Sequence, residues 1–173
     1  MNPMEILKNE HRIIERMLNS LQKMIRKKID FSDALKMIDF FKTFADKCHH
    51  GKEEGILFPE MEKAGIPKEG GPIGVMLQEH NIGREYIKGM AEAIEEKNEE
   101  KFIQNAEGYI DLLKDHIFKE DNILFDMAEA HLDKNKKKEI FEKFDEFEKN
   151  NIGEGIHETY HKLVEEMEKI YKY

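Results

Sequence analysis

Apolar residues recur along most of the chain at alternating steps of three and four, which predicts helices that each bury one stripe. The first helix is expected to begin at Asn2-Pro3, a good cap and first turn, and to end near Lys28. A second is expected to start from a cap at Ser32, to bend at Pro59 and to stop at Gly65. The pattern therefore predicts a helical hairpin at the amino-terminal end.

A Gly/Pro-rich break at residues 65–71 separates this hairpin from a second one. Its helices are expected to run from Pro72 to Ile94 and from Phe102 to Met127, with a polar turn between them. Four long helices with short connections are typical of an all-α, up-down-up-down antiparallel four-helix bundle, assigned here to residues 1–131. Residues 132–173 are expected to form a helical extension, too short to fold alone, that packs on the bundle and completes or covers any site there.

Polar residues interrupt these stripes in a repeated pattern. Residues 49–58 and 116–125 both read His-x-x-Lys-Glu-acidic-x-Ile-Leu-Phe, with an offset of 116 − 49 = 67 residues. A Glu-His pair at residues 10–11 recurs at residues 79–80, with an offset of 80 − 11 = 69. The two hairpins are therefore expected to be related by a pseudo-two-fold axis. The inward positions that carry a histidine or a glutamate are His11, His49, Glu53, His80, His116 and Glu120.

The four histidines among them are expected to lie at similar heights in an antiparallel bundle, within about two or three helical turns. A lone His-x-x-x-Glu pair on a helix has a simpler interpretation, as a core imidazole or a solvated surface pair. Six buried ionisable groups without a counter-charge are costly, however, and a metal ion would compensate for them. Imidazoles and carboxylates suit Fe, Mn or Zn, and a carboxylate can bridge two ions. The neighbouring His50, Glu54 and Asp121 are interpreted as outer or surface groups.

Composition narrows the classes of function. A formal net charge of −9 argues against general binding to nucleic acid or to anionic membranes. The single cysteine, Cys48, excludes an internal disulfide and a thiolate metal cluster. The start of the chain lacks the apolar core of a signal peptide, and no stretch is long and apolar enough for a membrane span. A cytoplasmic protein, monomeric or weakly dimeric, is the simplest expectation.

The motifs together resemble the hemerythrin-like, or HHE cation-binding, family. The matching segments are Glu10-His11, His49-x-x-Lys-Glu-Glu-x-Ile-Leu-Phe-Pro59, Gly71-Pro-Ile-Gly-Val-Met-x-x-Glu-His80 and His116-x-x-Lys-Glu-x-x-Ile-Leu-Phe125. The resemblance implies a non-haem centre of two iron ions, bridged by the two glutamates and by an oxo or hydroxo group. It also implies an open position for O₂, NO or peroxide, and a role in oxidative or nitrosative stress defence, sensing or repair of iron centres.

Two departures from the family pattern stand out. Oxygen-carrying hemerythrins have a second histidine four residues after the one on the third helix, where this chain has Arg84, and Gly83 leaves the inner face bare. The tail instead carries His157-Glu-Thr-Tyr-His161, which is similar to the ending of a subgroup of the family. We expect at least one of His157 and His161 to complete the metal coordination. The alternative is that the pair only docks the tail.

Two other classes of function are weighed against the same motifs. A di-iron oxidase or peroxidase of the ferritin or rubrerythrin type places Glu-x-x-His motifs on two separate helices, whereas both such motifs here fall on the last helix. A non-catalytic iron store or sensor is a further alternative. The sequence assigns no catalytic residue beyond the metal ligands and leaves enzymatic activity undecided.

Overall fold

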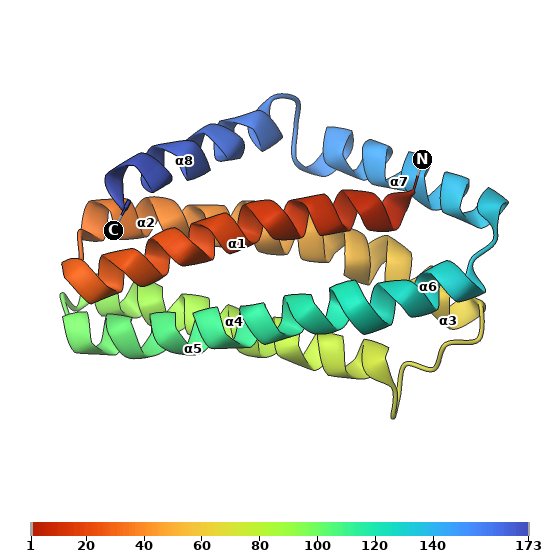
Figure 1. Ribbon diagram of the computed structural model, residues 1–173, viewed down its shortest axis with the longest axis horizontal. Helices are drawn as coiled ribbons and strands as arrows, with labels where there is room; N and C mark the ends of the chain where they lie inside the picture. Colours follow the sequence, from red (N-terminus) through yellow and green to blue (C-terminus); the bar gives the residue numbers. More distant parts are fainter. Residues whose placement is uncertain (1, 173) are drawn as a thin grey trace.

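The computed structural model describes residues 2–172 and consists of four long helical segments side by side, with two more helices across one side (Figure 1). The all-α fold predicted from the apolar stripes is confirmed. Short π-helical turns, labelled η, interrupt the second and fourth segments. The elements are α1 (Pro3–Lys27), α2 (Phe31–Phe40), η1 (Phe41–His50), η2 (Glu53–Leu57), α3 (Phe58–Lys63), α4 (Pro72–Glu95), α5 (Glu99–Lys119), η3 (Glu120–Leu124), α6 (Phe125–His131), α7 (Lys134–Asn151) and α8 (Ile156–Ile170).

The four segments close into a ring. Helix α1 packs against α2 and α5, and α4 packs against α2, η1 and α5. Helices α7 and α8 lie over α1 and the second segment, on the side away from α4 and α5 (Figure 1). The carboxy-terminal extension therefore covers one of the two hairpins more than the other.

Side-chain caps set the starts of the first two helical segments. Asn2 accepts a hydrogen bond from the backbone N–H of Met4, and Pro3 occupies the first turn, as predicted. The second segment begins at Phe31 because Asp30 accepts from the N–H of Asp33 at 3.0 Å. The predicted cap at Ser32 is therefore wrong. The cap is Asp30, two residues before Ser32.

Pro59 lies inside the second segment without ending it. It is the second residue of α3, which directly follows η2, and the helix continues to Lys63. Because proline lacks an N–H, it is best tolerated in a first helical turn, where that group has no intrahelical partner. The change from the π-helical to the α-helical pattern supplies such a turn.

The helices are strongly amphipathic. Along α1, Leu7, Ile14 and Leu18 are fully buried, while charged residues cover the outer face. Among the described helices, none combines the length and the apolar character that crossing a lipid bilayer requires.

The hydrophobic core is divided into two clusters. One packs Ile14 and residues beyond it in α1 against the first part of the second segment and against the middle of α5. The other packs Met4 and Leu7 against η2, α3, the start of α4, α6 and α7. The layer between them contains His11, which lies between Leu7 and Ile14 on α1. A band of polar side chains therefore crosses the bundle between the two halves of its core.

Candidate metal centre

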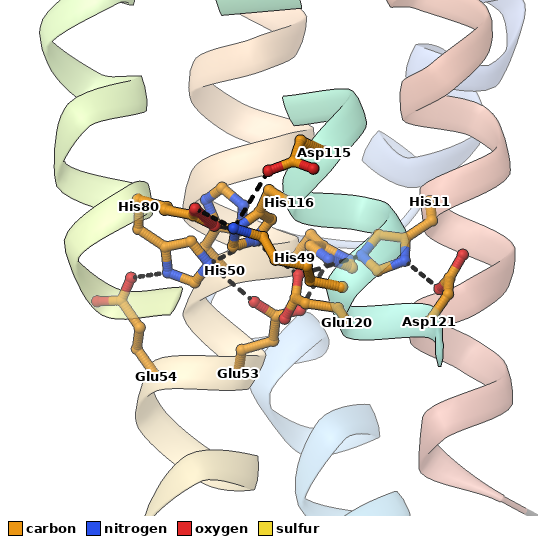
Figure 2. Close-up of polar contacts among 12 residues, drawn as sticks. His11, His49, His50, Glu53, Glu54, His80, Asp115, His116, Glu120 and Asp121 are labelled. Atoms are coloured by element: carbon orange, nitrogen blue, oxygen red, sulfur yellow. Dashed lines mark hydrogen bonds and ion pairs between the residues drawn. The ribbon is translucent and has the colours of Figure 1, made fainter. Parts of the chain in front are cut away.

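The six inward histidines and glutamates that the sequence singled out meet in this band. They come from α1, the second segment, α4 and the fourth segment, and each has 1% or less of its surface exposed. Figure 2 shows their side chains pointing toward one another across the middle of the bundle. The group consists of His11, His49, Glu53, His80, His116 and Glu120.

The structure adds a seventh member, His50. Its ring stacks on that of His80 with a centroid distance of 3.7 Å, and only 5% of the residue is exposed. The sequence interpretation placed it outside because the parallel between the two copies of the phrase selects His49 as the inward residue. An α-helical turn would also direct His50 about 100° away from His49. Both histidines lie in η1, and the wider turn of a π-helix lets two consecutive side chains face inward. The interpretation of His50 as an outer or surface group is therefore wrong.

The seven side chains form two adjoining clusters, each with its ligand atoms within 4.8 Å of one another. One cluster has three histidines and one carboxylate, and the other has two histidines and two carboxylates. Glu53 belongs to both, with Oε2 lying 3.1 Å from His80 Nε2 and Oε1 lying 3.0 Å from His49 Nε2. The three-histidine cluster is His50, Glu53, His80 and His116, and the two-histidine cluster is His11, His49, Glu53 and Glu120.

Glu120 also lies between the clusters. Its Oε1 is 2.7 Å from His116 Nε2, in the three-histidine cluster, and 3.5 Å from His11 Nε2, in the other. Glu53 and Glu120 are thus the two carboxylates between two sets of imidazoles. Carboxylates in this position have the right chemistry to bridge a pair of ions.

The arrangement fits metal ions better than it fits hydrogen bonding. All four carboxylate oxygens of Glu53 and Glu120, together with Nε2 of His11 and His49, are buried without a hydrogen-bond partner in residues 2–172. The N···O distances between them are short, but the hydrogen-bond geometry is not met. Orphaned polar atoms of this kind are rare in protein interiors and need an explanation. The lone pairs of these atoms converge on common points rather than on hydrogen-bond donors. Cations at those points would explain why the atoms have no hydrogen-bond partner.

Each imidazole is held from behind by a carboxylate. The Nδ1 of His11 donates to Asp121 at 2.7 Å, and that of His80 donates to Glu54 at 2.7 Å (Figure 2). Because a carboxylate only accepts, these contacts place the proton on Nδ1 and leave the inward Nε2 as the donor atom for a metal. The other three pairs are His49 with Glu10 at 3.0 Å, His50 with Asp46 at 3.0 Å and His116 with Glu79 at 2.9 Å.

The repeated sequence phrase is explained by a further layer of contacts. Lys52, three residues after His49, donates to Glu10, the carboxylate that orients His49. Lys119, three residues after His116, donates to Glu79 in the same way. The acidic residue after each inward glutamate, Glu54 or Asp121, orients the histidine on the first helix of the other hairpin, His80 or His11. Every repeated polar position of the phrase therefore has a structural role.

Arg84 and His50 break this symmetry. The guanidinium of Arg84 bridges Asp46 and Glu54, with NH2 lying 2.9 Å and 2.6 Å from their oxygens. It thereby holds both of the carboxylates that orient the stacked His50 and His80. The bare face at Gly83 is filled by Tyr109, whose Cε1 lies 3.6 Å from the position of an added Cβ, and by leucines of α5. Residues of α5, and not of the tail, therefore fill this gap.

His157 and His161 lie outside both clusters. His157 Nε2 is 3.1 Å from Oε2 of Glu10, so it contacts the carboxylate behind His49 rather than the centre itself. The ring of His161 lies 5.0 Å from that of His157 and 5.9 Å from that of Phe44. The structure does not bring these two imidazoles to the six inward residues.

A third set of possible ligands surrounds Lys52. Glu10, Cys48, Glu148 and His157 have donor atoms within 4.8 Å of one another. The ammonium of Lys52 lies 2.5 Å from both carboxylates and supplies the positive charge there. Burial raises the pKa of Cys48 to about 12, so its thiol stays protonated. This set is a partly buried ion-pair network rather than a candidate metal site.

Burial and the neighbouring charged groups shift the pKa values of the histidines in the centre. Burial alone would lower the pKa of His49 and His116, but the carboxylates of Glu53 and Glu120 outweigh it and raise both pKa values to about 10. Burial and the neighbouring His80 lower the pKa of His50 to about 3. Protons on some imidazoles thus balance the buried carboxylates, and metal ions would displace those protons.

Comparison with known proteins agrees with this geometry. No curated protein sequence matches the chain. The model of the hemerythrin HHE cation-binding domain matches residues 2–128, which span α1 to α6 and include all seven residues of the two clusters. The chain belongs to the hemerythrin HHE cation-binding domain family, as a helical bundle with a carboxy-terminal extension.

Proposed function

We propose that the protein holds two iron ions in the two clusters and uses them to bind or to react with a small ligand such as O₂, NO or peroxide. The observation that carries the proposal is the set of buried, unpartnered lone pairs on Glu53, Glu120, His11 and His49. His50, His80 and His116 would hold one ion, and His11 and His49 would hold the other, with the two glutamates shared. Iron in such a site supplies one-electron chemistry and coordination positions for a diatomic ligand.

The donor set supports iron. Imidazole and carboxylate ligands without a thiolate suit Fe, Mn and Zn, and the HHE family to which the chain belongs binds cations. The unequal number of histidines is expected to make the two ions chemically distinct. We infer a role in oxidative or nitrosative stress defence, in sensing or in the repair of iron centres, as the resemblance to the family implies.

The protein residues contribute orientation and exclusion of water. Five carboxylates fix the five imidazole planes, and the two core clusters close the site above and below. Pre-set ligands reduce the reorganisation that metal binding and ligand exchange require. A ferritin-type or rubrerythrin-type oxidase has less support, because Glu154 and Glu158 lie beside α8 and within it, away from both clusters.

Anaerobic reconstitution with Fe(II) tests the proposal. Metal analysis is expected to find two iron ions per chain, and stopped-flow spectra are expected to change on mixing with O₂, NO or H₂O₂. The ligand that gives the fastest complete change identifies the chemistry. Protein that remains fully folded but takes up no iron would contradict the proposal.

A further inference from the structure

The two copies of the Lys-Glu-His contact differ in their surroundings. In one copy, Lys119 and Glu79 lie near the surface, with 30% and 13% of their side chains exposed. In the other, the side chains of Lys52 and Glu10 are 0% and 4% exposed. The repeat makes both copies from the same residue types, so the difference arises from what covers the second one.

The carboxy-terminal extension is what covers it. Glu148 of α7 accepts from Lys52 Nζ at 2.5 Å, and His157 of α8 lies 3.1 Å from Glu10 Oε2. The ring of Phe147 packs so closely on Gly51 that a Cβ there would lie 2.8 Å from its Cζ. The contacts to Lys52 and Gly51 fall on the segment that carries His49, the contact to Glu10 falls on α1, and none falls on the Lys119 copy.

Glu10 connects these contacts to the centre. One of its oxygens, Oε1, accepts from His49 Nδ1 at 3.0 Å, while Oε2 faces both Lys52 and His157. A carboxylate held at both oxygens cannot rotate freely, so the plane of the His49 ring is fixed with it. In a buried network of this kind each contact strengthens the next, because the local dielectric constant is low.

We propose that His157 and Glu148 are positioning residues for the two-histidine cluster. They act through Glu10 and Lys52 on His49, so the extension sets how tightly one metal ion is held and leaves the three-histidine cluster unaffected. The proposal rests on the proposed function, because it requires ions in both clusters. It assigns a role to His157 and none to His161, which touches neither Glu10 nor Lys52.

A matched pair of tail variants separates positioning from simple docking. His157→Phe and His161→Phe both keep an aromatic ring beside Phe44, but only the first removes the contact to Glu10. His157→Gln restores a donor, because the glutamine amide nitrogen can occupy the place of the imidazole Nε2. Glu148→Ala has Glu146→Ala as its control, an exposed glutamate on the same helix.

The measurement is the release of ⁵⁷Fe to a chelator, with Mössbauer spectra to identify which site is emptied. In His157→Phe and Glu148→Ala we expect the two-histidine site to release iron about tenfold faster, since partners behind metal-bound histidines affect affinity by roughly 10–100-fold. The other site should release at the wild-type rate. His161→Phe, His157→Gln and Glu146→Ala should behave like the wild type.

Three outcomes would overturn the proposal: unchanged release in His157→Phe, equal acceleration at both sites, or equal effects of His157→Phe and His161→Phe. If His157→Phe fails to fold, as judged by circular dichroism, Glu148→Ala and His157→Gln carry the comparison. Wild-type protein that holds fewer than two ions would contradict the proposed function, which is a separate result.

Discussion

At the scale of single residues, the centre is organised by what lies behind each imidazole. Asp121, Glu10, Asp46, Glu54 and Glu79 each accept a hydrogen bond from one Nδ1. The rings are therefore oriented by the protein before any ion binds. Such outer partners fix the tautomer and raise the basicity of the coordinating nitrogen.

His50 provides a test of the three-histidine cluster. In His50→Leu we expect one of the two ions to be lost or to be held more weakly than in Asp46→Asn, which keeps the ligand and removes only its partner. Loss of such a partner typically costs roughly 10–100-fold in affinity. Iron content after dialysis against a graded chelator series measures both variants. Two tightly held ions in His50→Leu would show that His50 is not a ligand.

Lys52 and Lys119 provide a matched comparison of buried and exposed charge. Lys52→Met leaves Glu10 buried without its cation, and breaking a buried pair in this way costs about 3–5 kcal/mol. Lys119→Met removes the same charge from a partly exposed pair, so we expect a loss below about 1 kcal/mol. Urea unfolding of the metal-free variants gives both free energies. Equal losses would contradict the assigned difference in burial.

The helical stripe located four of the five histidines now seen together. A 3.6-residue period correctly describes α1, α4 and α5, which carry three of them, and it also reached His49 in η1. It missed His50 because residues 41–50 are π-helical, and no local residue preference announces that change. The Lys and Glu of the repeated phrase were visible in the sequence, but their roles were not. Their meaning depends on which helices are neighbours, and that information is tertiary.

At the scale of elements, the π-helical turns and the extension act on the same segment. Gly51 separates η1 from η2, and its missing side chain admits Phe147 of α7. The sequence predicted that residues 132–173 pack on the bundle, but not where they pack. The docking position depends on this glycine and on Lys52, whose importance becomes apparent only when α7 is in place.

Two glycines of the second segment test the docking of α7. An added Cβ at Gly55 meets nothing within 4 Å, so Gly55→Ala should stabilise the helix by roughly 0.5–1 kcal/mol. Gly51→Ala should lack this gain or destabilise the protein, because Phe147 must move. In a Phe147→Ala background the two substitutions should become similar. The measurement is the free energy of unfolding of each glycine variant, alone and combined with Phe147→Ala, and of Phe147→Ala itself. If the two glycine variants differ in stability as much in the Phe147→Ala background as in the wild type, the contact is refuted.

Glu60 links α3 to α7 and makes the docking sensitive to acid. Burial alone would raise its pKa, but Lys136 and Lys63 outweigh it and lower the pKa below the ordinary value of 4.5. A group with a lowered folded pKa stabilises the protein above the unfolded pKa, and this contribution is lost as the pH falls below 4.5.

The corresponding variant is Glu60→Gln, with the exposed Glu62→Gln as its control for net charge. We expect Glu60→Gln to lose up to ~1 kcal/mol near neutral pH and to approach the wild type in acid. Urea unfolding of the metal-free protein from pH 7 to pH 3 measures the difference. A deficit that grows as the pH falls would contradict the assignment.

At the scale of the whole molecule, two hairpins with a repeated sequence form two clusters of ligands that are unequal. The hairpin repeat supplies four histidines and two shared glutamates. His50 adds a third imidazole to the three-histidine cluster, and Arg84 holds Asp46, the carboxylate behind His50. The carboxy-terminal extension adds its contacts to the two-histidine cluster, behind His49. The resulting centre divides the hydrophobic core and is reached by all four segments of the bundle.

The most direct test of this arrangement is the position of the metal itself. Crystals of the iron-loaded protein, measured at the iron absorption edge, should show two anomalous peaks per chain. We expect one peak beside His50, His80 and His116 and the other beside His11 and His49, with both next to Glu53 and Glu120. A single peak, or a peak coordinated by His157 or His161, would contradict the account.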